Sequence, residues 1–259
     1  MHTNAEPAQT PVALITGATG GIGRHLVAQC LADGMRVVAL GRDERALQAL
    51  ASSSDAVLTC RVDLLSNVAI DVIQAACERM GPAIQLLVNC AGTGLLTPFA
   101  SESFEVQRDL CRLNFEAAAG VTHALLPRLM KGPGQVLNIA SLVGLMPAAN
   151  MAMLSASKAA LVNWSLALRA ELRGRIGVTA FCPGITRTPF LGRARMTHLN
   201  LDAFAQDPER VARRALVAAR RNRPIAYAGP IDSLTAAALR LAPADLLGRL
   251  AARVLSPVV

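Results

Sequence analysis

The chain has 259 residues, of which 53% are hydrophobic, 17% charged and 3% aromatic, and its formal net charge is +8. So few aromatic residues exclude the stacking surface of a single-strand nucleic-acid binder, and phosphorylated or acidic small ligands fit the positive charge better. The six cysteines are scattered without a Cys-x-x-Cys pair, which indicates thiols in a reducing compartment and neither a metal site nor a disulfide framework.

The start of the chain predicts neither export nor membrane insertion. Residues 1–11 are polar and lack the basic and apolar regions of a signal peptide, and no apolar run reaches the roughly 18 residues that span a bilayer. We expect a short disordered leader over residues 1–11, one domain over residues 12–259, and a cytoplasmic protein.

Strand and helix patterns alternate from residue 12 to about residue 228. Short apolar or β-branched runs predict strands at 12–16, 36–40, 56–61, 85–89, 134–139, 176–182 and 224–227. Amphipathic stretches predict helices at 21–33, 43–51, 66–80, 102–130, 151–173 and 206–222. This alternation predicts an α/β fold of Rossmann type, a doubly wound parallel sheet of about seven strands with helices on both faces. Residues 187–200 break the pattern and predict a mobile loop over a cleft.

The end of the chain carries two more apolar helical stretches, at 233–241 and 244–255, with Arg240, Arg249 and Arg253 among them. Such a pattern is compatible with an anionic membrane surface. Packing on the core or on another subunit is the favoured interpretation, because charge on the polar faces is sparse.

A glycine-rich turn, Thr16-Gly-Ala-Thr-Gly-Gly-Ile-Gly23, joins the first expected strand to the first expected helix. Gly17 would allow the tight turn, Gly21 a close approach of backbone to a pyrophosphate, and Gly23 close packing of helix on sheet. The phosphates would then meet the positive end of helix 21–33.

Three further segments follow expected strands: Val62-Asp63-Leu64, Asn89-Cys90-Ala91-Gly92 and Pro183-Gly-Ile-Thr-Arg-Thr188. Together with the glycine turn, and in register over residues 16–188, they resemble the motifs of the short-chain dehydrogenase/reductase family. The resemblance implies adenine contact at the first segment and a nicotinamide carboxamide at the third. The residues it implies for cofactor binding are Gly17, Thr19, Gly21, Ile22, Gly23, Arg42, Asp63, Leu64, Asn89, Ala91, Gly92, Lys158, Pro183, Gly184, Ile185 and Thr188.

The end of the second expected strand indicates which dinucleotide is bound. Chains that prefer NAD usually place an acidic residue there for the ribose 2′-OH, whereas this chain has Gly41-Arg42. The guanidinium of Arg42 suits a 2′-phosphate, and Arg24 would add charge nearby. The sequence therefore favours NADP(H), although either arginine alone could be an ordinary surface residue.

The resemblance extends to the catalytic segment with one departure. In the family a serine polarises the substrate oxygen, a tyrosine transfers the proton, a lysine holds the nicotinamide ribose, and an asparagine secures a water relay. Ser141, Lys158 and Asn114 match these positions, but Leu154 stands where the tyrosine belongs. Residues 154 and 158 are one helical turn apart, whereas Ser155 and Ser157 point away from that face.

Three functions remain open. The first is an NADP(H)-binding enzyme acting on a carbonyl or acyl-type small molecule by altered chemistry, either non-redox or independent of a tyrosine; the retained Ser141 favours it slightly. The second is a catalytically silent cofactor-binding subunit or sensor. The third is a carbonyl or 3-oxoacyl reductase with another proton donor.

The expected partners are a small-molecule substrate and further copies of the chain, without nucleic acid or a transmembrane segment. Met146, Met151, Met153 and Leu154 suggest an apolar pocket. Arg187, Arg193 and Arg195 would attract an acyl thioester, although a solvated basic loop explains them more simply. The resemblance implies a homodimer or homotetramer formed through helices 102–130 and 151–173.

Overall fold

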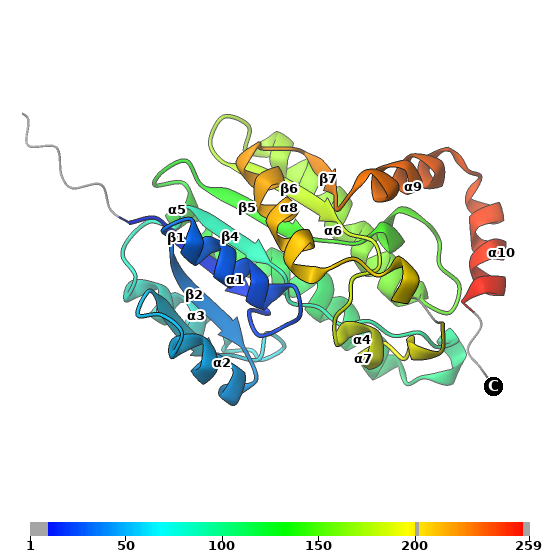
Figure 1. The fold of residues 1–259 in the computed structure, drawn as a ribbon, viewed down its shortest axis with the longest axis horizontal. Coiled ribbons are helices and arrows are strands. Elements are labelled where there is room, and N and C mark those ends of the chain that lie inside the picture. Colours follow the sequence, from blue (N-terminus) through cyan, green and yellow to red (C-terminus); the bar gives the residue numbers. More distant parts are fainter. Residues whose placement is uncertain (1–9, 200–201, 256–259) are drawn as a thin grey trace, which may run out of the picture.

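The computed structural model describes residues 10–199 and 202–255. Seven parallel strands form one sheet in the order β3-β2-β1-β4-β5-β6-β7 (Figure 1). The strands are β1 (Val12–Thr16), β2 (Arg36–Gly41), β3 (Val57–Arg61), β4 (Leu86–Asn89), β5 (Gln135–Ile139), β6 (Gly177–Cys182) and β7 (Ile225–Tyr227). The predicted doubly wound parallel sheet is confirmed.

The helices cover both faces of this sheet. They are α1 (Gly23–Ala32), α2 (Glu44–Ala51), α3 (Ala69–Glu78), α4 (Phe104–Cys111), α5 (Ala117–Leu129), α6 (Ala152–Glu171), α7 (Phe190–Arg193), α8 (Pro208–Arg220), α9 (Pro230–Leu241) and α10 (Ala244–Val254). Side chains of α1 and α8 build the core on one face, and side chains of α3 and α5 build it on the other.

The central strands are apolar throughout because both of their faces are buried. In β1, Ala13 and Ile15 enter the core shared with α1 and α8, whereas Val12 and Leu14 enter the core shared with α3 and α5. The strand order reverses between β1 and β4. In open α/β sheets, ligands bind at the carboxyl edge of such a switch point.

Two predicted elements differ from the structure. The helix expected at 102–130 is divided into α4 and α5 by a π-helical turn at Arg112–Glu116. The loop expected at 187–200 is partly helical, because α7 and a 3-10 turn at Thr197–Leu199 occupy half of it. The expected leader over 1–11 lies almost wholly outside the described residues.

The two apolar stretches at the end of the chain form α9 and α10, which extend the molecule beyond β7 at the opposite end from residue 10 (Figure 1). No helix within the described ranges is long and apolar enough to cross a bilayer.

Candidate active site

A cleft of about 1490 Å³ opens at the carboxyl ends of the strands and runs from the glycine turn to α10. Ordinary ligand pockets occupy roughly 300–1,000 Å³, so this cleft has room for more than one ligand. It is lined by these residues singled out from the sequence: Gly17, Thr19, Gly21, Ile22, Gly23, Arg42, Asp63, Leu64, Ala91, Gly92, Ser141, Leu154, Lys158, Pro183, Gly184, Ile185 and Thr188. Asn89 and Asn114 are not among the lining residues.

The glycine turn brings the start of α1 to the cleft. Gly17 has a φ of 64°, a conformation that favours glycine, and a Cβ there would lie 2.8 Å from Ala91 Cα. A Cβ at Gly23 would collide with the Gly17 carbonyl oxygen, so the helix packs directly on the turn. At Gly21 the close neighbour is the side chain of Thr188, which crosses over the turn.

No side chain caps the N-terminus of α1, although the Arg24 and His25 N–H groups donate to the carbonyls of Gly20 and Ile22. Ile22 occupies its N-cap, no side chain caps it, and no acidic residue lies in its first turn. Free N–H groups and the helix dipole at such an end attract anions. This end of the cleft therefore fits the phosphates of a dinucleotide.

Beyond β2, Arg42 lies on the wall of the cleft with its side chain 68% exposed, 4.0 Å from the Asp63 carboxylate. An exposed pair at this distance contributes little, so the guanidinium can turn toward a ligand. Asp43 also lines the cleft, but its carboxylate accepts the Ala46 N–H at 3.1 Å and caps α2. Arg24 lies outside the lining residues.

Asn89 is turned away from the cleft into the sheet. It is buried, and its amide donates to Thr122 Oγ1 at 3.0 Å and to Asn138 Oδ1 at 2.8 Å. Its expected contact with the cofactor therefore does not match the placement of its side chain, which joins β4 to β5 and α5. The backbone after β4 is fixed instead by Thr16, whose hydroxyl oxygen accepts the N–H groups of Cys90 and Ala91.

Asn114 lies in the π-helical turn and supports the cleft from behind. Its Oδ1 accepts the Thr93 N–H at 2.8 Å, and its amide donates to the Thr93 carbonyl and to Ser157 Oγ. A Cβ at Gly92 would come within 2.9 Å of Asn114 Oδ1 and 3.5 Å of Lys158 Nζ. Gly92 therefore leaves the lysine amine open to the cleft.

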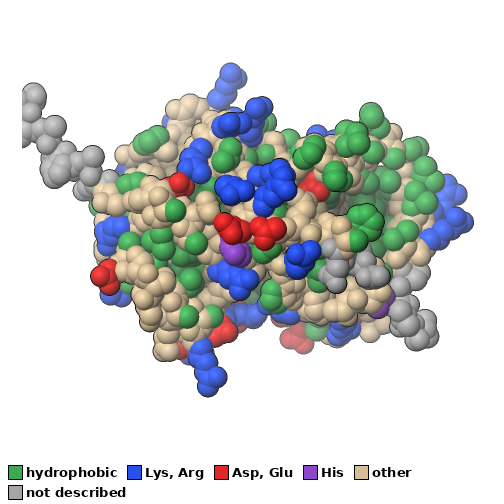
Figure 2. Space-filling model, viewed as in Figure 1, with side chains coloured by type: hydrophobic (Ala, Val, Ile, Leu, Met, Phe, Trp, Pro, Cys, Tyr) green, Lys and Arg blue, Asp and Glu red, His purple; other side chains and the backbone are tan. Residues whose placement is uncertain are grey.

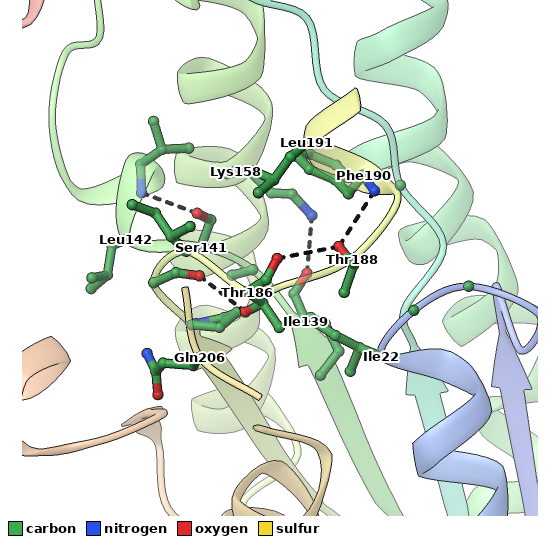
Figure 3. A pocket seen from close by; sticks show the side chains of 18 of the residues that line it. Ile22, Ile139, Ser141, Leu142, Lys158, Thr186, Thr188, Phe190, Leu191 and Gln206 are labelled. Carbon is green, nitrogen blue, oxygen red and sulfur yellow. Dashed lines mark hydrogen bonds between the residues drawn. The ribbon is translucent and has the colours of Figure 1, made fainter. Parts of the chain in front are cut away.

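Lys158 is the buried charged group of the site. Its ammonium donates to the Ile139 carbonyl at 3.0 Å (Figure 3), and the side chain is only 6% exposed. Burial lowers the pKa of Lys158 to about 8. The nearby thiols of Cys90 and Cys182 do not compensate, because burial raises their pKa values to about 12 and keeps them neutral.

Ser141 follows β5 and faces the same part of the cleft as Lys158 (Figure 3). Its hydroxyl oxygen accepts the Val143 N–H at 3.2 Å, which leaves the hydroxyl proton for another acceptor. The site thus offers a neutral donor at 141 and a titratable amine at 158.

Leu154 belongs to a buried apolar cluster with Leu95, Met151 and Met196, and it also lines the cleft. The chain's one tyrosine, Tyr227, lies on β7 and is not among the described residues that line the cleft. Neither Leu154 nor its apolar neighbours can transfer a proton.

The basic loop divides into free and paired arginines. Arg187 and Arg193 line the cleft, and no ion pair holds them within the described chain, whereas Arg195 pairs with Glu102 at 3.1 Å. The sequence favoured packing of the stretch 244–255 on the core or on another subunit, but it did not predict that α10 lines this cleft with Leu247, Leu250, Ala251 and Val254. The described residues hold no cluster of His, Cys, Asp or Glu suited to a metal ion.

Comparison with known proteins agrees with this geometry. Residues 11–198 match the family model described as short chain dehydrogenase. The chain is 33% identical over 178 residues to the NADP-dependent 3-hydroxy acid dehydrogenase YdfG of Salmonella typhi, covering 67% of this chain and 72% of that protein. It is 32% identical over 180 residues to the serine 3-dehydrogenase of Agrobacterium fabrum, covering 68% and 72%. A solved short-chain dehydrogenase from Sphingobium yanoikuyae in complex with NADPH superposes with a TM-score of 0.77 at 28% identity, covering 88% and 93%.

Proposed function

The chain belongs to the short-chain dehydrogenase family, and from that premise we propose that it binds NADP(H) and acts on a carbonyl or acyl-type small molecule without a tyrosine proton donor. The observation that carries this proposal is the side chain at 154. A leucine lines the cleft at the position where the family pattern has tyrosine, while Ser141 and Lys158 keep their places in the same cleft.

NADP(H) is supported by the residues present along the cleft. The uncapped start of α1 suits the pyrophosphate, and Arg42 suits the 2′-phosphate. Asp43 is engaged as a helix cap and so is not free to select a 2′-hydroxyl. Lys158 would hold the nicotinamide ribose, and Thr188 the carboxamide. The relative YdfG is NADP-dependent by name, and the Sphingobium structure is in complex with NADPH.

The bound dinucleotide would supply or accept the reducing equivalents of a redox reaction. Ser141 would donate its free hydroxyl proton to a substrate oxygen and hold the carbonyl in place. Lys158, whose pKa of about 8 is close to neutral pH, would exchange a proton with the cleft more readily than an ordinary lysine. A missing general acid usually costs roughly 10²–10⁴ in rate, so these groups would support slow turnover.

Two alternatives keep specific support. The apolar surroundings of Leu154 favour a silent cofactor-binding subunit or sensor. The unpaired Arg187 and Arg193 favour a reductase of an acyl thioester that uses another donor. In each case we place the protein in the cytoplasm as a homodimer or homotetramer.

Leu154→Tyr tests the proposal, with Leu154→Phe as a control that adds the ring without the hydroxyl. NADPH oxidation would be measured against ketones and β-ketoacyl thioesters. We expect little turnover by the unmodified protein, a gain of about 10²-fold on at least one substrate for the tyrosine variant, and no gain for phenylalanine.

Rapid turnover by the unmodified protein would contradict a site without an efficient donor and favour the reductase alternative. Tyrosine and phenylalanine variants that both bind NADPH and both remain inactive would favour the silent alternative.

A further inference from the structure

The cleft continues past Leu154 into a region that no motif of the family accounts for. We call it the outer chamber and define it by Met151, Leu154, Leu191, Met196, Leu247 and Leu250, which come from three separate segments of the chain. Resting on the proposed function, we propose that the outer chamber holds an extended apolar part of the substrate, an unbranched alkyl or acyl chain, between α10 and the segment 190–199.

The lining of the outer chamber is almost free of charge. Within the segments 143–154, 190–199 and 247–255, Arg193 is the one charged side chain among the described residues that line the cleft. The other lining side chains there are aliphatic, methionine or phenylalanine. Because this wall offers few hydrogen-bond partners, a polar substrate would lose solvation in it without compensation.

The exposed side chains of α10 point to a missing apolar partner. All four of Leu247, Leu250, Ala251 and Val254 line the cleft, but Leu247 and Ala251 are buried, whereas Leu250 and Val254 are 46% and 70% exposed. Leu250 and Val254 are one helical turn apart and so form one stripe. Figure 2 shows hydrophobic side chains gathered over α9 and α10 at the end of the molecule. Covering the part of this stripe that faces the cleft would remove apolar surface from water.

The two-helix segment α9–α10 is fixed to the rest of the cleft wall at both of its ends. The Asn150 amide donates to the Leu255 carbonyl at 3.0 Å, which ties the end of α10 to the segment leading to Leu154. At the start of α9, buried Asp232 accepts the Gly184 N–H at 3.0 Å and the Gln206 amide at 2.7 Å. The segment α9–α10 is therefore part of the cleft wall, and its start contacts the loop after β6.

A chain-length series of straight-chain methyl ketones tests this inference by binding alone. Titration calorimetry with the full-length protein, with and without NADPH, would compare ketones of about four to ten carbons. We expect the affinity to rise by up to about fourfold per methylene until the chamber is filled.

Leu250→Glu and Leu246→Glu form a matched pair, because both leucines are on α10 and are 46% and 44% exposed, but only Leu250 lines the cleft. Leu250→Glu should lower the affinity for the longest ketone by at least tenfold and leave the affinity for the shortest ketone unchanged. Leu246→Glu should leave the affinities for both ketones unchanged. NADPH affinity and thermal midpoint, measured for both variants, should match those of the unmodified protein.

An affinity independent of chain length, or equal losses in both variants, would overturn the inference. If the ketone affinity depends on chain length as expected but the protein binds no NADPH, the proposed function is contradicted while the inference about the outer chamber is supported.

Discussion

At the scale of single residues, Lys158 is buried without an ion-pair partner among the described residues. Its ammonium has the Ile139 carbonyl as a hydrogen-bond acceptor, and its neighbouring thiols are neutral. Transferring the ammonium from water into this site costs free energy, which the lowered pKa expresses. A bound ribose would supply hydrogen-bond acceptors in addition to the Ile139 carbonyl.

Lys158→Met should therefore change how stability depends on pH. The unfolded lysine titrates near 10.5 and the folded one near 8, so between these values the unfolded chain binds more protons and the free energy of unfolding rises with pH. Below pH 8 the buried ammonium costs on the order of 3 kcal/mol. In urea unfolding from pH 7 to 9, the variant should have the higher free energy of unfolding at pH 7, and this difference from the unmodified protein should shrink as the pH rises.

The cysteines with raised pKa act oppositely above pH 9, and Lys158 itself lowers the pKa of Cys90 and Cys182. The two unfolding curves are therefore compared below pH 9, where the thiols contribute little. If the free energy of unfolding depends on pH in the same way for both proteins, the lowered pKa of Lys158 is contradicted.

Arg42 should set the preference between dinucleotides. In a fluorescence titration we expect the protein to bind NADPH roughly 10- to 100-fold more tightly than NADH, as expected for hydrogen bonds to a charged group. Arg42→Asp should reduce or reverse this difference in affinity. Arg61→Asp is the control, since Arg61 is equally exposed at 69% but does not line the cleft. Equal affinities in the unmodified protein would exclude a role for Arg42 in selection.

At the scale of elements, α2 decides what Asp43 can do. Asp43→Ala should remove the cap of α2 and lower the free energy of unfolding by about 1 kcal/mol. Asp43→Asn should keep the cap and, by removing a negative charge beside Arg42, tighten NADPH binding modestly. Thermal unfolding and NADPH titration of both variants separate the two roles. Equal stability of the two variants would show that the cap contributes nothing.

Elements differ in how far the sequence predicts them. The strands were predicted to within a residue because burial on both faces makes them continuous apolar runs between turn residues. The π-helical turn around Asn114 was not predicted, because it depends on contacts with Thr93 and Ser157, which are distant in sequence. The motif that contains Asn89 predicts where a strand ends, but not that its side chain turns into the sheet.

At the scale of the whole molecule, the exposed side chains of α4 support self-association. Phe104 is 65% exposed and Val106 44% exposed, on one of the helices through which the family resemblance implies that subunits pair. We expect light scattering at micromolar concentration to give a dimer or tetramer. Phe104→Glu should shift the mass toward the monomer, whereas Phe204→Glu, on a residue 74% exposed at the cleft, should not. A monomeric unmodified protein would contradict this expectation.

The overall architecture and the cofactor end of the cleft could be predicted because the motifs follow strands whose carboxyl ends must share one edge. The part of the cleft beyond Leu154 could not be predicted. The amphipathic pattern of α10 shows that one face is buried, but not against which surface. The structure places α10 on the cleft wall, where the Asn150 amide donates to the Leu255 carbonyl.

That tie has a practical consequence for handling the protein. Residue 255 lies at the rim of the cleft, whereas residue 10 lies at the opposite end of the molecule, where β1 begins (Figure 1). An affinity tag or fusion partner joined at Leu255 would therefore start beside the cleft, and one joined ahead of β1 would start far from it. Immobilisation through the N-terminal side is the arrangement that leaves ligand exchange unobstructed.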